Sequence, residues 1–541
     1  MKRRSFLTAT TLASIGLSTL IITSCMKNSK DEVTANGVVP VDNLLFDLDE
    51  QTIASLTEKF AAGTYTIEQV TKLYLDRILA IDKDGPTLNS VIEINPEALE
   101  IAKKLDAELA AGKKRGPLHG IPVLIKDNID TADKMHTTAG SLAMMGNIAS
   151  KDAFLVQKLR AAGAVILGKT NLSEWANFRS TQSSSGWSSR GRQTKNPYIL
   201  DHSPCGSSAG SGVAVSANLC AVAVGTETDG SIVCPASVNG IVGIKPTVGL
   251  VSRSGIIPIS ATQDTAGPMA RTVTDAAILL GGMIGIDEND AVTLESKGKQ
   301  QIDYTKFLDK NGLVGKRIGI ERKLQGTNPV INAVFTDSVN LLKSLGATVV
   351  EIDYLDRISE LGDAEYTVLQ YEFKDGLNRY LATANANVKS LKEVIDFNLL
   401  NRSKAMPYFN QEILDSSQLK GPLNEQEYKK ALTKSFDGSK AILDSVIEGN
   451  SLDAICGITM GPACSIDVIY GDKWGYSLTM PAAASGYPHI TIPGGVVYDL
   501  PIGFSFFGLP YTEGNLIGMG YAFEQATMKR AKPNFKKAFL L

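Results

Sequence analysis

Serine hydroxyls set among glycines form the densest group of candidate catalytic side chains in the sequence. Residues 203–249 hold eight glycines interspersed with Ser and Thr, and the only charged residues there are Glu227, Asp229 and Lys245. Glycine permits backbone shapes that other residues cannot hold and lets a ligand approach the main chain closely. A hydroxyl becomes a good nucleophile only when a neighbouring base takes its proton. The function of this segment therefore depends on which base, if any, lies beside it.

Two interpretations of this segment do not rely on a lysine base, and the sequence fits both of them poorly. A phosphate cradle is disfavoured because residues 206–212 contain neither G-x-G-x-x-G nor a following G-K-[ST]. A nucleophile elbow matches Gly206-Ser207-Ser208-Ala209-Gly210, with Ser208 as the nucleophile. That mechanism needs a downstream histidine, and the only one, His489, lies in an apolar segment typical of a core strand. The elbow also leaves a second cluster, Gly230-Ser231, unexplained.

A third interpretation pairs the two serine clusters with a lysine base. Lys126 ends the apolar segment 121–125 (IPVLI), which predicts a buried strand. Burial disfavours the charged form of lysine and lowers its pKa toward neutrality, so that the amine can accept a proton. Most lysines are exposed and inert, but one at the end of a buried run is a better candidate for a base.

Composition disfavours metal-dependent and nucleic-acid-binding functions. The four histidines have no metal-ligand spacing, and the six cysteines form no C-x-x-C pair, so we expect no metal site. The 54 Lys and Arg against 57 Asp and Glu give a formal net charge of −3, without a basic run beyond the first residues. We therefore expect no nucleic-acid partner.

Helical and strand patterns alternate along the body of the chain and predict an α/β protein with a mixed sheet flanked by many helices. Helices are predicted at residues 66–81, 96–111, 152–162 and 329–345, and strands at 121–125, 164–167, 221–224, 241–244, 347–352, 489–492 and 504–507. The charged stretch 356–448 predicts a helical insertion covering part of the site. Although 541 residues would suit about three domains, no linker is evident, and we expect one large catalytic domain over residues 46–541.

The first residues are typical of an export signal. Lys2, Arg3 and Arg4 precede a mostly apolar run at residues 6–22. The sequence Ile22-Thr23-Ser24-Cys25 resembles a bacterial lipobox, and Arg3-Arg4-Ser5-Phe6-Leu7 resembles a twin-arginine signal. We expect residues 1–25 to direct export, Cys25 to carry a lipid anchoring the protein to the cell envelope, and residues 26–45 to form a flexible tether. A plain cleaved secretory signal is the alternative.

The motifs taken together resemble the amidase signature family. They are Lys126 after its apolar strand, Gly206-Ser207-Ser208, Ser231 24 positions after Ser207, and Gly243-Ile244-Lys245-Pro246-Thr247. The likeness extends over nearly the whole chain after the signal and includes Gly168-Lys169-Thr170-Asn171-Leu172 and the segment 488–495 (PHITIPGG).

The resemblance implies a Ser–Ser–Lys triad in one α/β domain. Ser231 would be the nucleophile that forms an acyl-enzyme, Ser207 a bridging serine after a cis peptide bond, and Lys126 the general base. The amides of Thr228, Asp229, Gly230 and Ser231 would stabilise the oxyanion, with Ser208 beside them, and no cofactor would be needed. The implied reaction is hydrolysis of a carboxylic or peptide C-terminal amide to the acid and ammonia.

Several positions depart from the family's usual pattern. Cys205 and Ala209 stand where glycine is usual, and Glu227 and Asp229 stand where Asp and then Gly are common. The segments 225–235 and 180–187 are most similar to the bacterial peptide amidase branch. The acidic residue beside the oxyanion hole leaves other substrates open. The alternatives are a non-catalytic exported solute-binding lipoprotein and a transamidase-like subunit; the export signal argues against the second. The oligomeric state is left open.

Overall fold

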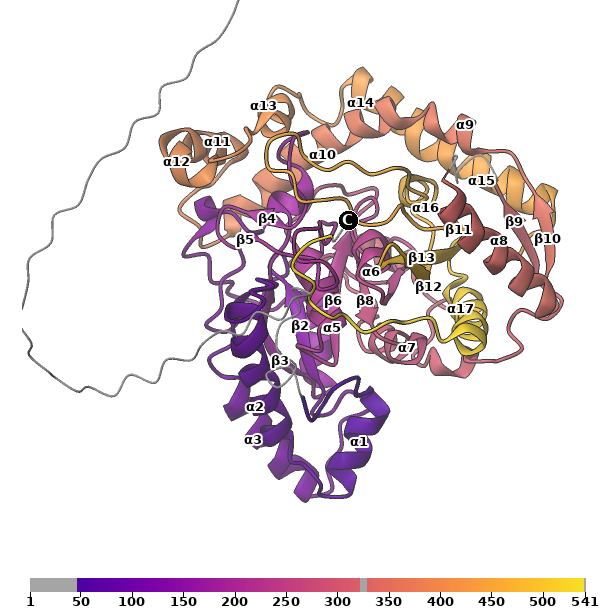
Figure 1. Ribbon diagram of the computed structural model, residues 1–541. Coiled ribbons are helices and arrows are strands. Elements are labelled where there is room, and N and C mark those ends of the chain that lie inside the picture. Colours follow the sequence, from indigo (N-terminus) through magenta and orange to yellow (C-terminus); the bar gives the residue numbers. More distant parts are fainter. Residues whose placement is uncertain (1–45, 322–327, 540–541) are drawn as a thin grey trace, which may run out of the picture.

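The computed structural model describes residues 46–321 and 328–539. The predicted export signal, the predicted lipid attachment site Cys25 and the predicted tether at residues 26–45 lie outside the described residues. Figure 1 shows a central sheet surrounded by helices.

One eleven-stranded sheet runs through the described part of the chain, in the order β1-β3-β2-β6-β8-β7-β12-β13-β11-β9-β10. Its strands are β1 (Val91–Ile94), β2 (Pro122–Lys126), β3 (Val165–Thr170), β6 (Val222–Glu227), β7 (Val242–Lys245), β8 (Thr265–Ala270), β9 (Arg317–Ile320), β10 (Thr348–Glu351), β11 (Ala454–Ile458), β12 (His489–Val497) and β13 (Leu500–Phe507). A separate two-stranded ribbon pairs β4 (Trp187–Ser188) with β5 (Arg192–Gln193).

The sheet is mixed, which confirms the predicted fold class. β2 runs parallel to both β3 and β6, whereas β6, β8, β7, β12 and β13 form an antiparallel series. Every residue of β2, β3, β6, β7 and β8 is buried. Strands covered on both faces read as continuous apolar runs rather than alternating ones, which is why residues 121–125 and 221–224 were recognisable.

Helices pack around this sheet on all sides (Figure 1). They are α1 (Ile53–Ala61), α2 (Ile67–Arg77), α3 (Ala98–Ala110), α4 (Phe154–Ala161), α5 (Ala209–Ser216), α6 (Val233–Val238), α7 (Val273–Gly281), α8 (Pro329–Ser344), α9 (Leu355–Ser359), α10 (Gly362–Thr383), α11 (Leu391–Leu400), α12 (Arg402–Ala405), α13 (Glu412–Gln418), α14 (Gln426–Leu432), α15 (Gly438–Gly449), α16 (Met480–Ala484) and α17 (Glu513–Thr527).

Helix α2 begins at Ile67, one residue into its predicted range, because Thr66 caps it. The Thr66 hydroxyl accepts the N–H of Gln69, and the Gln69 side chain accepts the N–H of Thr66, which forms a capping box at the start of α2. The α-helix ends at Arg77, and a π-helical turn, Ile78–Lys83, continues it through the rest of the predicted range.

The stretch 356–448 consists of helices without a strand, and its longest helix, α10, packs against α13 and α14. Four strands of the large sheet lie where none was predicted, β1, β8, β9 and β11, and neither strand of the β4–β5 ribbon was predicted. β8 contains Gly267 and Pro268, which normally argue against a central strand, yet it pairs with both β6 and β7.

The main apolar core lies between the sheet and its helices. Cys205, Cys220, Cys234 and Cys456 are buried free thiols, and Cys464 is partly exposed. Among the described residues, none of the helices has both the length and the apolar character to cross a bilayer.

Candidate active site

The site begins at the carboxyl ends of two neighbouring parallel strands. Ile125 of β2 is opposite Val224 of β6, so Lys126 and Thr226 emerge from the same edge of the sheet. Ligand sites in sheets with parallel strands commonly lie at this edge. β2 thereby delivers Lys126, and β6 leads directly into the segment that contains Ser231.

Lys126 is completely buried, and its amine touches three oxygens. Nζ lies 2.8 Å from Ser207 Oγ, 2.8 Å from Thr226 Oγ1 and 3.2 Å from the Thr226 carbonyl oxygen. Burial lowers the pKa of Lys126 from 10.5 to about 7, although the charges of Asp264 and Glu227 act in the opposite direction. Near neutral pH a substantial fraction of this amine is therefore uncharged and able to accept a proton.

The contacts of Lys126 suit the neutral amine. An uncharged amine has two N–H donors and one lone pair, and it meets one hydroxyl and two oxygens of Thr226. If both donors point to Thr226, the lone pair faces Ser207. Thr226 Oγ1 also accepts a hydrogen bond from Asn128 Nδ2 at 3.0 Å, which holds that hydroxyl in place.

Ser207 lies in a tightly packed turn before α5. The peptide bond between Gly206 and Ser207 is cis, and Ser207 is fully buried. A side chain at Gly206 would place its Cβ 2.2 Å from Ser173 Oγ, so any larger residue would displace the Ser173 hydroxyl. The hydroxyl of the next residue, Ser208, donates to the Thr226 carbonyl at 3.0 Å and accepts the Thr226 N–H at 3.1 Å. Ser208 thus fastens the turn to β6, and its predicted part in substrate binding stays a prediction.

Ser231 lies on the second serine loop, which joins β6 to α6. The Ser208 N–H donates to the Ser231 carbonyl at 3.1 Å, so the two serine loops are held side by side. Ser231 is 6% exposed. Its hydroxyl makes no hydrogen bond with residues 46–321 or 328–539, and its proton transfer to Ser207 stays a prediction.

Glu227 holds the loop around Ser231 by accepting hydrogen bonds from the two residues that follow it. Its Oε2 accepts the N–H groups of Ile232 at 2.7 Å and Val233 at 3.0 Å, at the start of α6. Burial raises the pKa of Glu227, while Lys245 and these amides oppose the rise. Gly230 has φ +77°, and a Cβ there would lie 2.9 Å from Cys234 Sγ, which requires glycine.

The loop leaves main-chain donors available next to Ser231. Within the described part of the chain, the N–H groups of Asp229 and Ser231 donate to no other residue. Backbone amides at a loop and helix start are the usual donors for a developing oxyanion. The arrangement can therefore stabilise a tetrahedral intermediate, although the role of each amide is a prediction.

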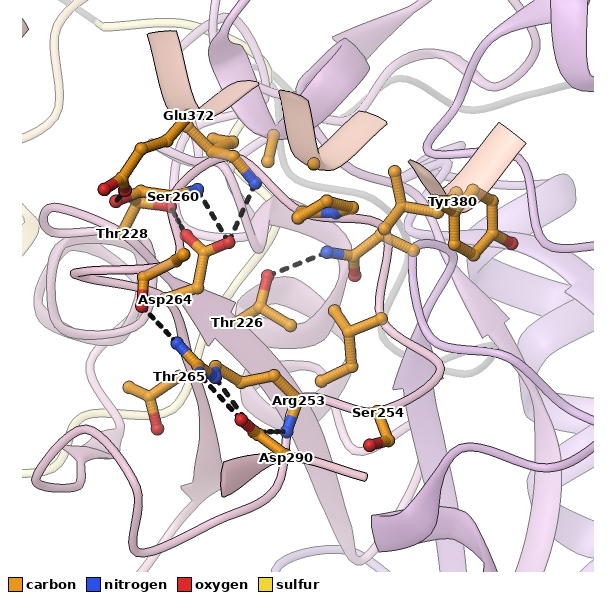
Figure 2. A pocket seen from close by; sticks show the side chains of 18 of the residues that line it. Thr226, Thr228, Arg253, Ser254, Ser260, Asp264, Thr265, Asp290, Glu372 and Tyr380 are labelled. Carbon is orange, nitrogen blue, oxygen red and sulfur yellow. Dashed lines mark hydrogen bonds and ion pairs between the residues drawn. The ribbon is translucent and has the colours of Figure 1, made fainter. Parts of the chain in front are cut away.

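A cavity of about 340 Å³ opens beside the lysine end of the site (Figure 2). Asn128, Thr226 and Thr228 line it together with Glu372 and Tyr380 of α10. The Thr228 hydroxyl donates to Asp264 Oδ1 at 2.6 Å, and burial raises the pKa of Asp264 to about 6. Part of the 356–448 segment thus forms a wall of this cavity.

Sequence reasoning missed Asn128, Thr226 and Asp264. Asn128 lies two positions after Lys126, and Thr226 lies one position before Glu227, but no sequence pattern indicates that they contact each other or the lysine. Asp264 lies 33 positions beyond Ser231 without a motif of its own.

The elbow interpretation is wrong, because His489 is buried and its Nε2 pairs with Ser505 Oγ at 2.6 Å, while the Ser208 hydroxyl is hydrogen-bonded to the main chain of Thr226. In the part of the chain that the structure describes, no group of three or more His, Cys, Asp or Glu side chains could hold a metal.

Comparison with known proteins identifies the family of the chain. The family model described as Amidase matches residues 69–517. A probable amidase from Arabidopsis thaliana is 41% identical over 502 residues, covering 91% of this chain and 92% of the relative. A putative amidase from Schizosaccharomyces pombe is 39% identical over 512 residues, covering 90% of this chain and 87% of the relative.

Among solved structures, the native peptide amidase from Stenotrophomonas maltophilia superposes with a TM-score of 0.86 at 47% identity. It covers 91% of this chain, and the match spans 100% of that structure.

Proposed function

The chain belongs to the amidase signature family, and from this premise we propose that it hydrolyses the C-terminal amide of amidated peptides, or a related carboxylic amide, to the acid and ammonia. The observation that carries the proposal is the buried Lys126, 2.8 Å from Ser207 and with its pKa lowered to about 7. The likeness to a peptide amidase at 47% identity favours amidated peptides over free amides.

The proposed reaction starts with a proton relay. Neutral Lys126 accepts the Ser207 proton as Ser207 accepts that of Ser231, and Ser231 Oγ forms a bond to the amide carbonyl carbon. Main-chain amides of the loop 228–231 stabilise the oxyanion, and one such donor is typically worth about 3–4 kcal/mol. The proton returns through Ser207 to the nitrogen as the C–N bond breaks and ammonia leaves. Water then attacks the acyl-enzyme by the same relay and releases the acid.

Removal of the proposed nucleophile tests the reaction directly. Ser231→Ala should lower kcat on an N-acetylated amino acid amide by about 10³-fold or more, since the loss of a covalent nucleophile removes the acyl-enzyme route. With hydroxylamine added, the wild-type protein should also form the hydroxamate, which reports the acyl-enzyme.

Ser485→Ala is a matched control, because that hydroxyl bonds to the carbonyl of Pro481 in α16. A loss below tenfold in Ser231→Ala would refute the assignment. Ligand binding without turnover of any amide would favour the solute-binding alternative.

We also propose that the protein is exported and held at the cell envelope by a lipid on Cys25, as the pattern of residues 1–25 suggests. Cys25→Ala should move the protein from the membrane fraction to the soluble fraction of a bacterial host. Unchanged fractionation would refute the anchor, and a cytoplasmic protein bound to partner subunits would instead favour the transamidase-like alternative.

A further inference from the structure

Asp229 places a carboxyl group two residues before the proposed nucleophile without an internal partner for one of its oxygens. Oδ1 is buried and accepts no hydrogen bond from the residues that the structure describes. No Lys, Arg or His of those residues forms an ion pair with this side chain. A buried carboxylate oxygen without a partner is costly unless a ligand satisfies it.

Glu365 brings a second carboxyl to the same loop from the first turn of α10. The side chain is 7% exposed, and Gln263 Nε2 donates to its Oε1 at 2.8 Å. The same Gln263 Nε2 lies 3.3 Å from the Thr228 carbonyl oxygen, so one amide group ties Glu365 to the loop before Ser231. Within the described residues, Oε2 of Glu365 accepts no hydrogen bond.

The start of α10 is also anchored next to Gly230 by the α16 segment. A Cβ at Gly362 would lie 3.9 Å from Met480 Cε, and one at Gly230 would lie 3.1 Å from Thr479 Cγ2. Residues 479 and 480 therefore lie against both the start of α10 and the loop before Ser231.

The charges around these two carboxyls are not balanced. Burial raises the pKa of Asp229 to about 6, and Glu227 adds to the rise, while Thr479 and Lys245 oppose it. Burial and then the charge of Asp229 raise the pKa of Glu365 to about 8, against Gln263. Lys245 of β7 is the nearby cation, and Glu227 and Glu513 of α17 interact with it more strongly than Asp229 does. The side of the loop facing α10 therefore has excess negative potential.

We propose that Asp229 and Glu365 form a subsite that binds a cationic group on the acyl part of the substrate, either the α-ammonium of an amino acid amide or a basic side chain next to the amide. This proposal rests on the proposed amidase function and names its preferred substrates. An ammonium or guanidinium placed there would satisfy both unpartnered oxygens and offset the mutual repulsion of the two carboxyls.

Three amides with the same reacting group test the subsite. N-acetyl-norleucinamide is neutral, N-acetyl-lysinamide adds a side-chain ammonium, and free norleucinamide adds an α-ammonium. For the wild-type protein at pH 7, where both amines carry a charge, we expect kcat/KM for one of the cationic amides to exceed that for the neutral amide by about tenfold or more. The better cationic amide identifies which ammonium the subsite takes.

Glu365→Gln should reduce this preference to about threefold or less, mainly through a higher KM for the cationic amide. Asp363→Asn removes the same charge from an exposed position in the same turn of α10 and should leave the preference unchanged. Glu365→Asp, which keeps the carboxyl, should retain part of it.

The preference should also rise with pH, because a cation binds the ionised form of Glu365 better than the protonated form. Dividing kcat/KM for the cationic amide by kcat/KM for the neutral amide cancels the pH dependence that Lys126 gives to both. Measured with N-acetyl-lysinamide, whose side-chain ammonium stays charged over this range, the ratio should therefore increase between pH 6 and about 8 in the wild-type protein and increase less in Glu365→Gln.

A wild-type protein without preference for either cation would overturn the proposal. So would Glu365→Gln lowering turnover of neutral and cationic amides equally, which would assign the carboxyl to the reacting amide itself. If none of the three amides is hydrolysed, the proposed function fails instead, so the two failures are distinguishable.

Discussion

Lys126 is suited to act as a base because of where it is buried rather than because of a charged partner. Its three contacts are neutral oxygens of Ser207 and Thr226, and the carboxyls of Asp264 and Glu227 act on its pKa only through their charges. Thr226 supplies two acceptors at once, which orients the lone pair without adding a charge. The same geometry would hold a lysine poorly if Thr226 lost its hydroxyl.

The lowered pKa of Lys126 predicts how activity depends on pH. Below about 7 the amine is protonated and has no lone pair for Ser207, so kcat/KM for a neutral amide should fall about tenfold per pH unit. Above that pKa it should reach a plateau. A pH–rate profile from 5 to 9 measures this. Lys126→Ala should be nearly inactive throughout, and a flat wild-type profile would contradict the role of Lys126 as the base.

At the scale of elements, the site depends on how β6 ends and α6 begins. β6 carries Thr226 and Glu227 in succession, with one facing Lys126 and the other facing the start of α6. A six-residue helix has little intrinsic stability, and the first N–H groups of any helix need acceptors. Glu227 supplies one and thereby holds the loop that carries Ser231.

Glu227→Ala should therefore lower both stability and activity. Loss of an acceptor for two buried N–H groups should reduce the free energy of unfolding by about 1–3 kcal/mol, measured by urea denaturation. Because Ile232 and Val233 follow Ser231 directly, kcat should fall as well.

Glu227→Gln keeps an acceptor oxygen and should recover part of both losses. Glu58→Ala, at an exposed position of α1, is the control for removing a glutamate. If Glu227→Ala unfolds and turns over like the wild-type protein, the capping role is wrong.

The elements that sequence patterns predicted are those with a continuous apolar or helical signal. Residues 121–125 and 329–345 match β2 and α8 closely. Burial on both faces gives β2 a continuous apolar run, and α8 begins after the capping residue Asn328, so both are visible in the local sequence. The sequence of β8 (TAGPMA) has no such pattern. Its Gly267 is required because a Cβ there would lie 2.0 Å from the Ile244 carbonyl oxygen, a contact with a strand that pairs with it only in the folded sheet.

At the scale of the whole molecule, an arginine near the C-terminal end of the described chain contacts both its N-terminal end and two central loops. Arg530, beyond α17, binds Glu50 at 2.8 and 2.7 Å and donates to the carbonyls of Ser216 and Gly240. One guanidinium therefore connects the region before α1 to the loops that follow α5 and α6. Arg530 and hydrogen bonding by Asn218 lower the pKa of Glu50 to about 2, despite burial.

This contact predicts a pH-dependent contribution to stability. The folded-state pKa of Glu50 lies below its unfolded value of 4.5, so the stabilisation is fully present above 4.5 and is lost as the pH falls toward about 2. Glu50→Gln should lower the free energy of unfolding by about 2–3 kcal/mol at pH 7. The difference between variant and wild type should shrink as the pH falls through that window. A difference that does not change with pH would contradict the ion pair.

The sequence by itself determined which groups could do the chemistry and roughly which strand or loop holds each. The local features are Lys126 at the end of an apolar run, the two glycine-flanked serines and the α/β alternation. Such features depend on residues near one another in the chain, so they can be recognised in the sequence. Only the tertiary structure decided that Lys126 meets Ser207 and Thr226, that Glu227 caps α6 and that Glu365 reaches the loop beside Asp229. The physical reason is that contact and desolvation are set by neighbours distant along the chain: 81 residues separate Lys126 from Ser207. The burial that brings the pKa of that lysine near 7 is a property of the closed fold.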